Sequence, residues 1–126
     1  SGLTFDSVIL DAPAYSPTAS IVCPHPVFVE DDVMDAMSKV LGSHGVLSVN
    51  VFLLDARRKE EVIRKFAAHF RSCSAPKIHD NGQKLLVCSN RAGFTWADHR
   101  TRMLDNLKRF DEIMGTEIAS HVDHLN

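Results

Sequence analysis

The chain has 126 residues, 44% of them hydrophobic and 24% charged, which suits one domain, residues 1–126, with a buried core. The formal net charge of −2 argues against a broad electrostatic surface for nucleic acid or for an anionic membrane. The most apolar window, Val46–Leu54, covers nine residues, whereas a membrane-spanning helix needs about 20. We therefore expect no nucleic-acid partner and no membrane span.

The first predicted elements are a strand, a loop and a helix. Apolar and β-branched residues over Phe5–Leu10 predict a strand. The loop Asp11–Pro26 follows and holds four of the five prolines. A helix starts at Val27 or Glu30 and runs to Leu41, since its apolar residues share one helical face: Val29, Val33, Met37, Val40 and Leu41.

The second strand and helix come directly after two glycines. Val46–Leu54 is apolar on nearly every residue, as a parallel strand covered on both faces should be. Residues 55–70 form the next predicted helix, with an apolar stripe of Val62, Ile63, Phe66 and Phe70.

The last third of the chain predicts a hairpin and a helix. Pro76–His79 and Lys84–Asn90 read as two short strands, because Asn81-Gly82 between them tolerates positive φ. A final helix begins near Trp96 or Ala97, and Gly115 breaks or kinks it. Its apolar stripe, spaced by three and four, runs through Met103, Leu104, Leu107, Phe110, Met114, Ile118, Val122 and Leu125.

The cysteines and histidines predict neither a disulfide framework nor a metal site. Cys23, Cys73 and Cys88 are odd in number and scattered, without a C-x-x-C pair, which favours a reduced, cytoplasmic chain. Cys23-x-His25 and His121-x-x-His124 have no second ligand pair at zinc spacing. We expect no metal, and the two C-terminal histidines read as a surface or a helix end.

The element order β-α-β-α-β-β-α predicts an α/β fold. Two right-handed crossovers between parallel strands, followed by an antiparallel hairpin and a C-terminal helix, make half of a doubly wound, Rossmann-like sheet.

This order resembles the C-terminal half of the class I S-adenosylmethionine-dependent methyltransferase domain, in its spermidine-synthase-like branch. Within that branch the chain is most similar to the methyltransferase-like protein 13 family. That family has a Cys-Pro-x-Pro-x-Phe-Val run before a helix, a Leu-to-Gly turn after it and an Asn in the next strand. Cys23–Val29, Leu41–Val46 and Asn50 match these features. The resemblance implies a methyltransferase that uses S-adenosylmethionine and acts on a protein.

The resemblance also implies that the cofactor-binding half of such a domain is not in this sequence. A Gly-rich turn after the first strand and an acid after the second normally hold the cofactor. The chain contains no Gly-x-Gly, and its first strand corresponds to the family's fourth. We therefore assign no cofactor-binding residue. We expect that this fragment binds S-adenosylmethionine weakly or not at all and is inactive alone.

Asp11 and Tyr15 are the candidate catalytic residues. Ligands of open α/β sheets bind beyond the carboxyl ends of strands, where Asp11 could accept a hydrogen bond from a substrate amine or act as a base. Alternatively, Asp11 closes the strand as an Asx turn or cap. The run Asp11–Tyr15 resembles the Asp/Asn-Pro-Pro-aromatic loop of amine methyltransferases, with one extra residue and one proline only. Tyr15 would hold the target nitrogen, or it packs as a loop tyrosine.

Three further features have two interpretations each. Asn50 is either a local structural hydrogen-bonding residue or part of the floor of an active-site cleft. The cationic residues Arg100, Arg102, Lys108 and Arg109 form a solvated face or bind an acidic partner. The C-terminal apolar stripe packs on the sheet or pairs two chains.

Two other function classes compete with methyl transfer. If the first half of the sheet is absent, the Phe5–Leu10 edge is left unpaired, which predicts a non-catalytic association module. A homodimer would then form through that edge or through the C-terminal helix. Aminopropyl transfer, as in spermidine synthase, needs the same missing cofactor half and is the weaker alternative.

Overall fold

A computed structural model describes residues 2–15, 21–76 and 83–122 of the chain. Its main sheet has the strand order β1-β4-β6-β5, formed by Ser7–Leu10, Val46–Phe52, Gln83–Ser89 and Ser72–Ser74. β1 and β4 are parallel, and β6 is antiparallel to both β4 and β5. A two-stranded ribbon joins β2 (Ala14–Tyr15) to β3 (Ile21–Val22). The α/β half-sheet predicted from the sequence is confirmed.

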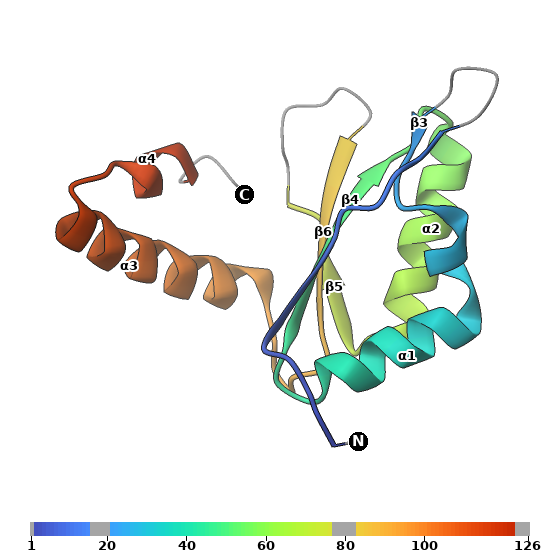
Figure 1. Cartoon of the computed structure of the whole chain (residues 1–126), viewed down its shortest axis with the longest axis horizontal. Helices are drawn as coiled ribbons and strands as arrows, with labels where there is room; N and C mark the ends of the chain where they lie inside the picture. Colours follow the sequence, from blue (N-terminus) through green and yellow to red (C-terminus); the bar gives the residue numbers. More distant parts are fainter. Residues whose placement is uncertain (1, 16–20, 77–82, 123–126) are drawn as a thin grey trace.

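Helices lie on both sides of this sheet (Figure 1). On one side are η1 (Pro26–Val29), α1 (Asp31–Leu41) and α2 (Ala56–His69). On the other side α3 (Trp96–Met114) extends away from the strands and leads into the short α4 (Ile118–Val122). Within the described residues, no helix combines the length and the hydropathy that a membrane span requires.

The core lies between the sheet and α1 and α2. Alternate residues of β4 point to opposite faces, so Leu47, Val49 and Val51 are buried while Ser48 and Asn50 on the open face are only half-buried. The helices contribute Met34, Leu41 and Phe66, the largest fully buried side chains. The remaining members of the cluster are Leu10, Leu53, Phe70, Leu86 and Cys88.

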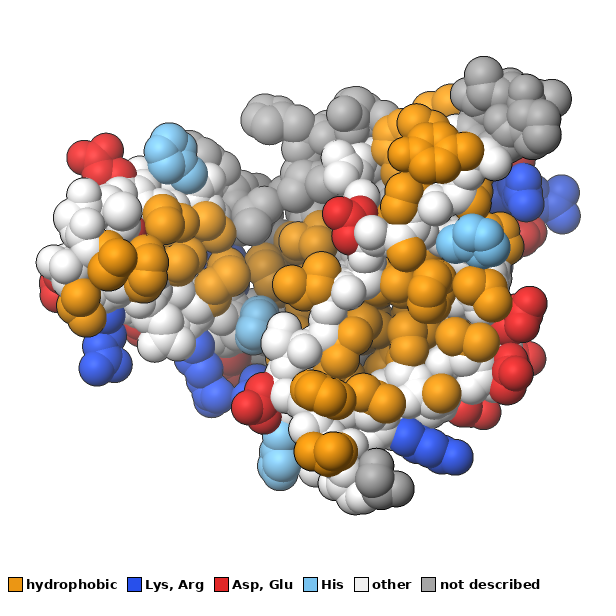
Figure 2. Space-filling view, in the orientation of Figure 1, with side chains coloured by type: hydrophobic (Ala, Val, Ile, Leu, Met, Phe, Trp, Pro, Cys, Tyr) orange, Lys and Arg blue, Asp and Glu red, His pale blue; other side chains and the backbone are white. Residues whose placement is uncertain are grey.

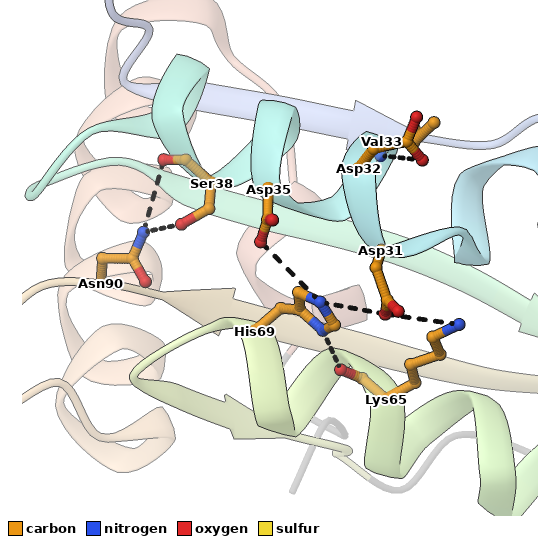
Figure 3. Close-up of polar contacts among 8 residues, drawn as sticks. All are labelled: Asp31, Asp32, Val33, Asp35, Ser38, Lys65, His69 and Asn90. Atoms are coloured by element: carbon orange, nitrogen blue, oxygen red, sulfur yellow. Dashed lines mark hydrogen bonds and ion pairs between the residues drawn. The ribbon is translucent and has the colours of Figure 1, made fainter.

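Side-chain hydrogen bonds attach α1 to α2 and to the end of β6 (Figure 3). The His69 ring lies between the two helices, with Nε2 3.3 Å from Asp31 Oδ1 and Nδ1 2.9 Å from the Lys65 carbonyl oxygen. Asn90, just after β6, donates to the Ser38 hydroxyl at 2.7 Å and accepts from the Arg71 amide at 3.1 Å. These contacts hold the two helices over one face of the sheet.

The C-terminal helix ends at Gly115, where the sequence predicts a break or kink. Gly115 adopts a left-handed conformation with φ 68° and ends α3. Asp111 then accepts hydrogen bonds from the Thr116 hydroxyl at 2.6 Å and from the amides of Ile118 and Ala119, both at 2.9 Å. The Thr116 hydroxyl and these amides hold the pKa of Asp111 below its ordinary value. The carboxylate thus caps α4 and ties it back to α3.

Besides β4, the described strand that pairs with β6 is one that the sequence did not predict. This strand is β5, Ser72–Ser74, and it lies opposite Val87–Ser89 directly after α2. Residues 77–79 of the predicted strand Pro76–His79 lie outside the described residues. The predicted turn Asn81-Gly82 lies outside the described residues.

Two of the cysteines are paired, although the sequence favours reduced thiols. Cys73 lies directly opposite Cys88 in the antiparallel β5–β6 pair, and their sulfurs form a disulfide. Cys23 remains a buried free thiol. The spacing could not indicate this pair, because strand register and not sequence proximity brings the two residues together. The cytoplasmic location remains a prediction.

Candidate functional site

A chain of polar side chains lies at the carboxyl end of β1. Asp11 follows β1 directly, and its Oδ1 accepts a hydrogen bond from Asn50 Nδ2 of β4 at 3.0 Å. The Asn50 Oδ1 in turn accepts from Gln83 Nε2 at the start of β6 at 2.8 Å. β1 and β4 are parallel and β6 is antiparallel to β4, so the ends of β1 and β4 lie beside the start of β6. The three side chains therefore meet at the same end of the sheet. The network positions the Asp11 carboxylate from two neighbouring strands.

Cys23, in the segment between β3 and η1, lies beside Asp11 and β4. Its backbone amide donates to the Phe52 carbonyl at 2.9 Å, and its carbonyl accepts from the Phe52 amide at 2.8 Å. The thiol lies 3.9 Å from Asp11 Oδ1 and is 2% exposed. Burial, and then the negative charge of Asp11, raises the pKa of the Cys23 thiol. The thiol is therefore a neutral neighbour of the carboxylate and a poor nucleophile.

These residues border a cavity of about 260 Å³. It lies beyond the carboxyl ends of β1 and β4, where open α/β sheets bind ligands. Asp11 is exposed, and no described residue donates to its Oδ2, so this oxygen is open to a ligand. The complete lining comprises Asp11, Pro13, Ile21, Cys23, Asn50, Phe52 and Gln83.

Comparisons with known proteins give the site its context. No family model matches the chain. Mouse and human proteins named eEF1A lysine and N-terminal methyltransferase are each 26% identical to it over 84 residues, which are 67% of this chain and 12% of either relative. The frog relative from Xenopus laevis, with the same name, is 25% identical over 84 residues.

A solved structure covers more of the chain than these alignments do. The crystal structure of human methyltransferase-like protein 13 in complex with SAH superimposes with a TM-score of 0.66 at 19% identity, over 91% of this chain and 50% of that one. The chain has the fold of part of a methyltransferase-like domain. It spans about one eighth of the curated relatives, which corresponds to the 12% coverage, and half of the solved chain.

In this methyltransferase-like fold, the two predicted catalytic residues are not brought together. Asp11 lines the cavity, but Tyr15 does not. Tyr15 lies in the β2–β3 ribbon opposite Ile21, and it is 76% exposed. Its partner Ile21 lines the cavity, so Tyr15 lies on the surface next to a cavity residue without lining the cavity itself.

The structure shows the contacts of Asn50 and adds one residue that sequence reasoning missed, Gln83. Asn50 joins Asp11 to Gln83, so it is both a hydrogen-bonding partner and part of the cavity wall. Gln83 faces Asn50 diagonally across the β4–β6 pair, since Asn50 is opposite Leu85. Its polar side chain at the start of an apolar strand is the signal that could have indicated it. The sequence analysis considered Cys23 as a metal ligand and as part of the family run, and the structure places its thiol 3.9 Å from Asp11 Oδ1.

The described histidines and cysteines form no cluster with metal-ligand geometry. Within residues 2–15, 21–76 and 83–122, no three His, Cys, Asp or Glu side chains gather closely enough to hold a metal ion. His25 does not line the cavity beside Asp11, and its Nδ1 accepts a hydrogen bond from the Val27 amide at 3.1 Å. His121 is exposed in α4, and His124 lies outside the described residues.

Proposed function

We propose that this chain forms the acceptor-side half of an S-adenosylmethionine-dependent methyltransferase that modifies protein amines, either lysine side chains or N-termini. The similarity to eEF1A lysine and N-terminal methyltransferases supports the reaction class. The single observation that carries the proposal is the Asp11 carboxylate, held by Asn50 at the carboxyl edge of the sheet.

The proposed chemistry assigns Asp11 to the amine. A methyl group moves from a sulfonium centre to nitrogen only when the nitrogen lone pair is free, so the protonated amine must first lose a proton. Oδ2 of Asp11 would accept a hydrogen bond from the amine, orient it, and accept that proton or pass it to water. Asn50 keeps Oδ1 occupied and so leaves Oδ2 for the substrate. Tyr15, exposed on β2, would contact the protein around the target nitrogen.

The cofactor must be held largely by residues that this chain does not supply. The sequence has no Gly-x-Gly turn, and the solved structure with SAH is twice as long as the part that the chain matches. We therefore propose that the chain alone binds S-adenosylmethionine weakly or not at all and transfers no methyl group.

Calorimetry with S-adenosylmethionine and with S-adenosylhomocysteine tests the proposal on this chain and on the longest product of its gene. We expect no saturable heat for the chain and binding for a product that includes a Gly-x-Gly strand-turn. In such a product, Asp11→Asn should lower methyl transfer to a protein amine by about 100-fold. The matched change Asp6→Asn, before β1, should leave the rate unchanged.

Three outcomes would contradict parts of this proposal. Tight cofactor binding by the chain alone would overturn its predicted incompetence. Failure of the longer product to bind either cofactor form would refute the methyltransferase assignment. Transfer of an aminopropyl group in place of a methyl group would favour the spermidine-synthase-like alternative.

A second candidate function is association of two copies, favoured by exposed apolar side chains. Phe5 and Ile9 at the β1 edge are 55% and 77% exposed, and Ile113 on α3 is 82% exposed. Figure 2 shows hydrophobic side chains gathered over α3 and along the front of the sheet. An unpaired strand edge of this kind invites pairing with another chain.

We propose a homodimer through the β1 edge and expect twice the mass of the chain in sedimentation experiments. Ile9→Lys should shift the equilibrium to monomer, because a charged side chain at an edge opposes strand pairing. Ile113→Lys serves as the matched change on α3. If only Ile113→Lys dissociates the dimer, α3 is the interface, and a monomer at high concentration would refute association.

A further inference from the structure

A second, larger cavity lies at the opposite end of β1 from Asp11. It has a volume of about 590 Å³, within the usual range for small-ligand sites. Asp6, before β1, and Val46, at the start of β4, form its sheet side. Asp6 and Asp11 are separated by roughly 16 Å of extended chain, so this cavity is distinct from the proposed amine site.

The lining of this cavity combines cationic and apolar side chains. Arg91, Arg102 and His99 contribute two guanidinium groups and an imidazole. Met103, Leu107 and Phe110 contribute apolar surface and lie on α3, the helix that also carries His99 and Arg102. The remaining lining residues are Asp6, His44, Val46 and Asn106. Figure 2 shows Lys and Arg side chains along the lower side of the helical arm that α3 forms.

The structure fixes Arg91 in place. Its guanidinium carbon lies 5.4 Å from the centroid of the Phe94 ring, and Phe94 is buried. The same ring lies 5.4 Å from the His99 ring. The Arg91 amide donates to the buried Ser89 hydroxyl at 3.1 Å, and that hydroxyl donates to the Gly45 carbonyl at 2.8 Å. The cation therefore lies on a rigid aromatic support and is oriented before any ligand arrives.

Cationic side chains outnumber carboxylates in the lining of this cavity. Neither Arg91 nor Arg102 forms an ion pair with any described carboxylate, and the lining contains one carboxylate, Asp6. Burial lowers the pKa of His99, and the charges of Arg91 and Arg102 lower it further. Both guanidiniums thus act on the same imidazole, which indicates a local positive potential that an anion would relieve.

We propose that this cavity binds a phosphomonoester with a small apolar body. The phosphate group would accept hydrogen bonds from the guanidiniums of Arg91 and Arg102, whose planar donor geometry matches phosphate oxygens. The apolar body would contact Met103, Leu107 and Phe110. Nothing in this assignment depends on methyl transfer, because the two cavities lie at opposite ends of β1.

Titration with phenyl phosphate, followed by amide and imidazole NMR shifts at constant ionic strength, tests the assignment. We expect saturable binding, with inorganic phosphate at least about tenfold weaker because it cannot use the apolar lining residues. Arg102→Ala should weaken phenyl phosphate binding by about tenfold or more through loss of a charge-assisted hydrogen bond. Arg109→Ala removes the same charge from an exposed position of α3 outside the cavity and should leave binding unchanged.

The pKa of His99 gives a second readout. Non-specific attraction of an anion to the cationic surface of α3 would not change this pKa, whereas binding between Arg91 and Arg102 would. An anion between Arg91 and Arg102 cancels the charges that lower the pKa of His99, so that pKa should rise when phenyl phosphate is bound. Absence of saturable binding would overturn the proposal, as would equal losses in Arg102→Ala and Arg109→Ala. Equal affinity for inorganic phosphate would overturn the assignment of an organic phosphomonoester.

Discussion

Replacing Phe66 with alanine should lower the free energy of unfolding by about 3–5 kcal/mol. Phe66 is fully buried on α2 and lies in the core between the helices and the sheet. Its ring stacks on that of Phe70, with centroids 6.2 Å apart. Truncation removes the ring from this contact and leaves a cavity in the core between the helices and the sheet. Since whole domains are stable by about 5–15 kcal/mol, the loss is a large share of the total.

Urea unfolding followed by far-ultraviolet circular dichroism measures this loss. The matched control is Phe110→Ala on α3, the same change at a position that is 45% exposed, which should cost less than half as much. Phe66→Leu should fall between the two, because it retains a branched apolar side chain. Equal costs for Phe66→Ala and Phe110→Ala would contradict the core described here.

The elements that the sequence predicted well are those with strong local patterns. The unbroken apolar run of β4 and the helical stripe of α2 depend on residues close together in the chain, and both elements form near their predicted bounds. Asp55, just before α2, caps the helix by accepting from the amides of Arg57 and Arg58. Local chemistry determines these features, so a single sequence contains them.

The features that were missed depend on register between distant segments. β5 pairs with β6 at Ser72–Ser74, which has no alternating apolar pattern and so gave no strand signal. The Asn50–Gln83 hydrogen bond spans 33 positions in sequence and requires the β4–β6 register to be known. The position of Asp11 at a strand end was predicted, but its contacts with Asn50 and Cys23 could not be, because they join segments 39 and 12 positions apart.

The contrast between features set by local sequence and features set by strand register also applies to the candidate site. Asp11 follows from a local strand and the general rule that α/β sheets bind ligands at carboxyl ends. A loop resemblance suggested Tyr15 as a second site residue, with a surface loop tyrosine as the alternative, and in the β2–β3 ribbon its side chain is 76% exposed. For the proposed phosphomonoester cavity, the sequence offered one signal, the cationic residues of α3. The other polar lining residues, such as Arg91 and Asp6, come from distant segments.

Reduction of the Cys73–Cys88 disulfide should lower the free energy of unfolding by about 3 kcal/mol. The bond closes a loop between residues 15 positions apart, and a loop of this length restricts the unfolded chain by about that amount. β5 has only three residues and, among the described strands, pairs with β6 alone, so the covalent link is its strongest attachment to the sheet. Urea unfolding with and without a thiol reductant measures the difference.

The double variant Cys73→Ala/Cys88→Ala separates the bond from other effects of the reductant. Its stability should be low and should not change when reductant is added, whereas Cys23→Ala should respond as the unaltered chain does, because Cys23 is a free thiol. Alkylation after unfolding should label one cysteine without reductant and three with it. Three labelled cysteines without reductant would show the reduced chain that the sequence favours, and the predicted loss would then be absent. The same measurement on protein taken directly from cells establishes which of the two forms is present there.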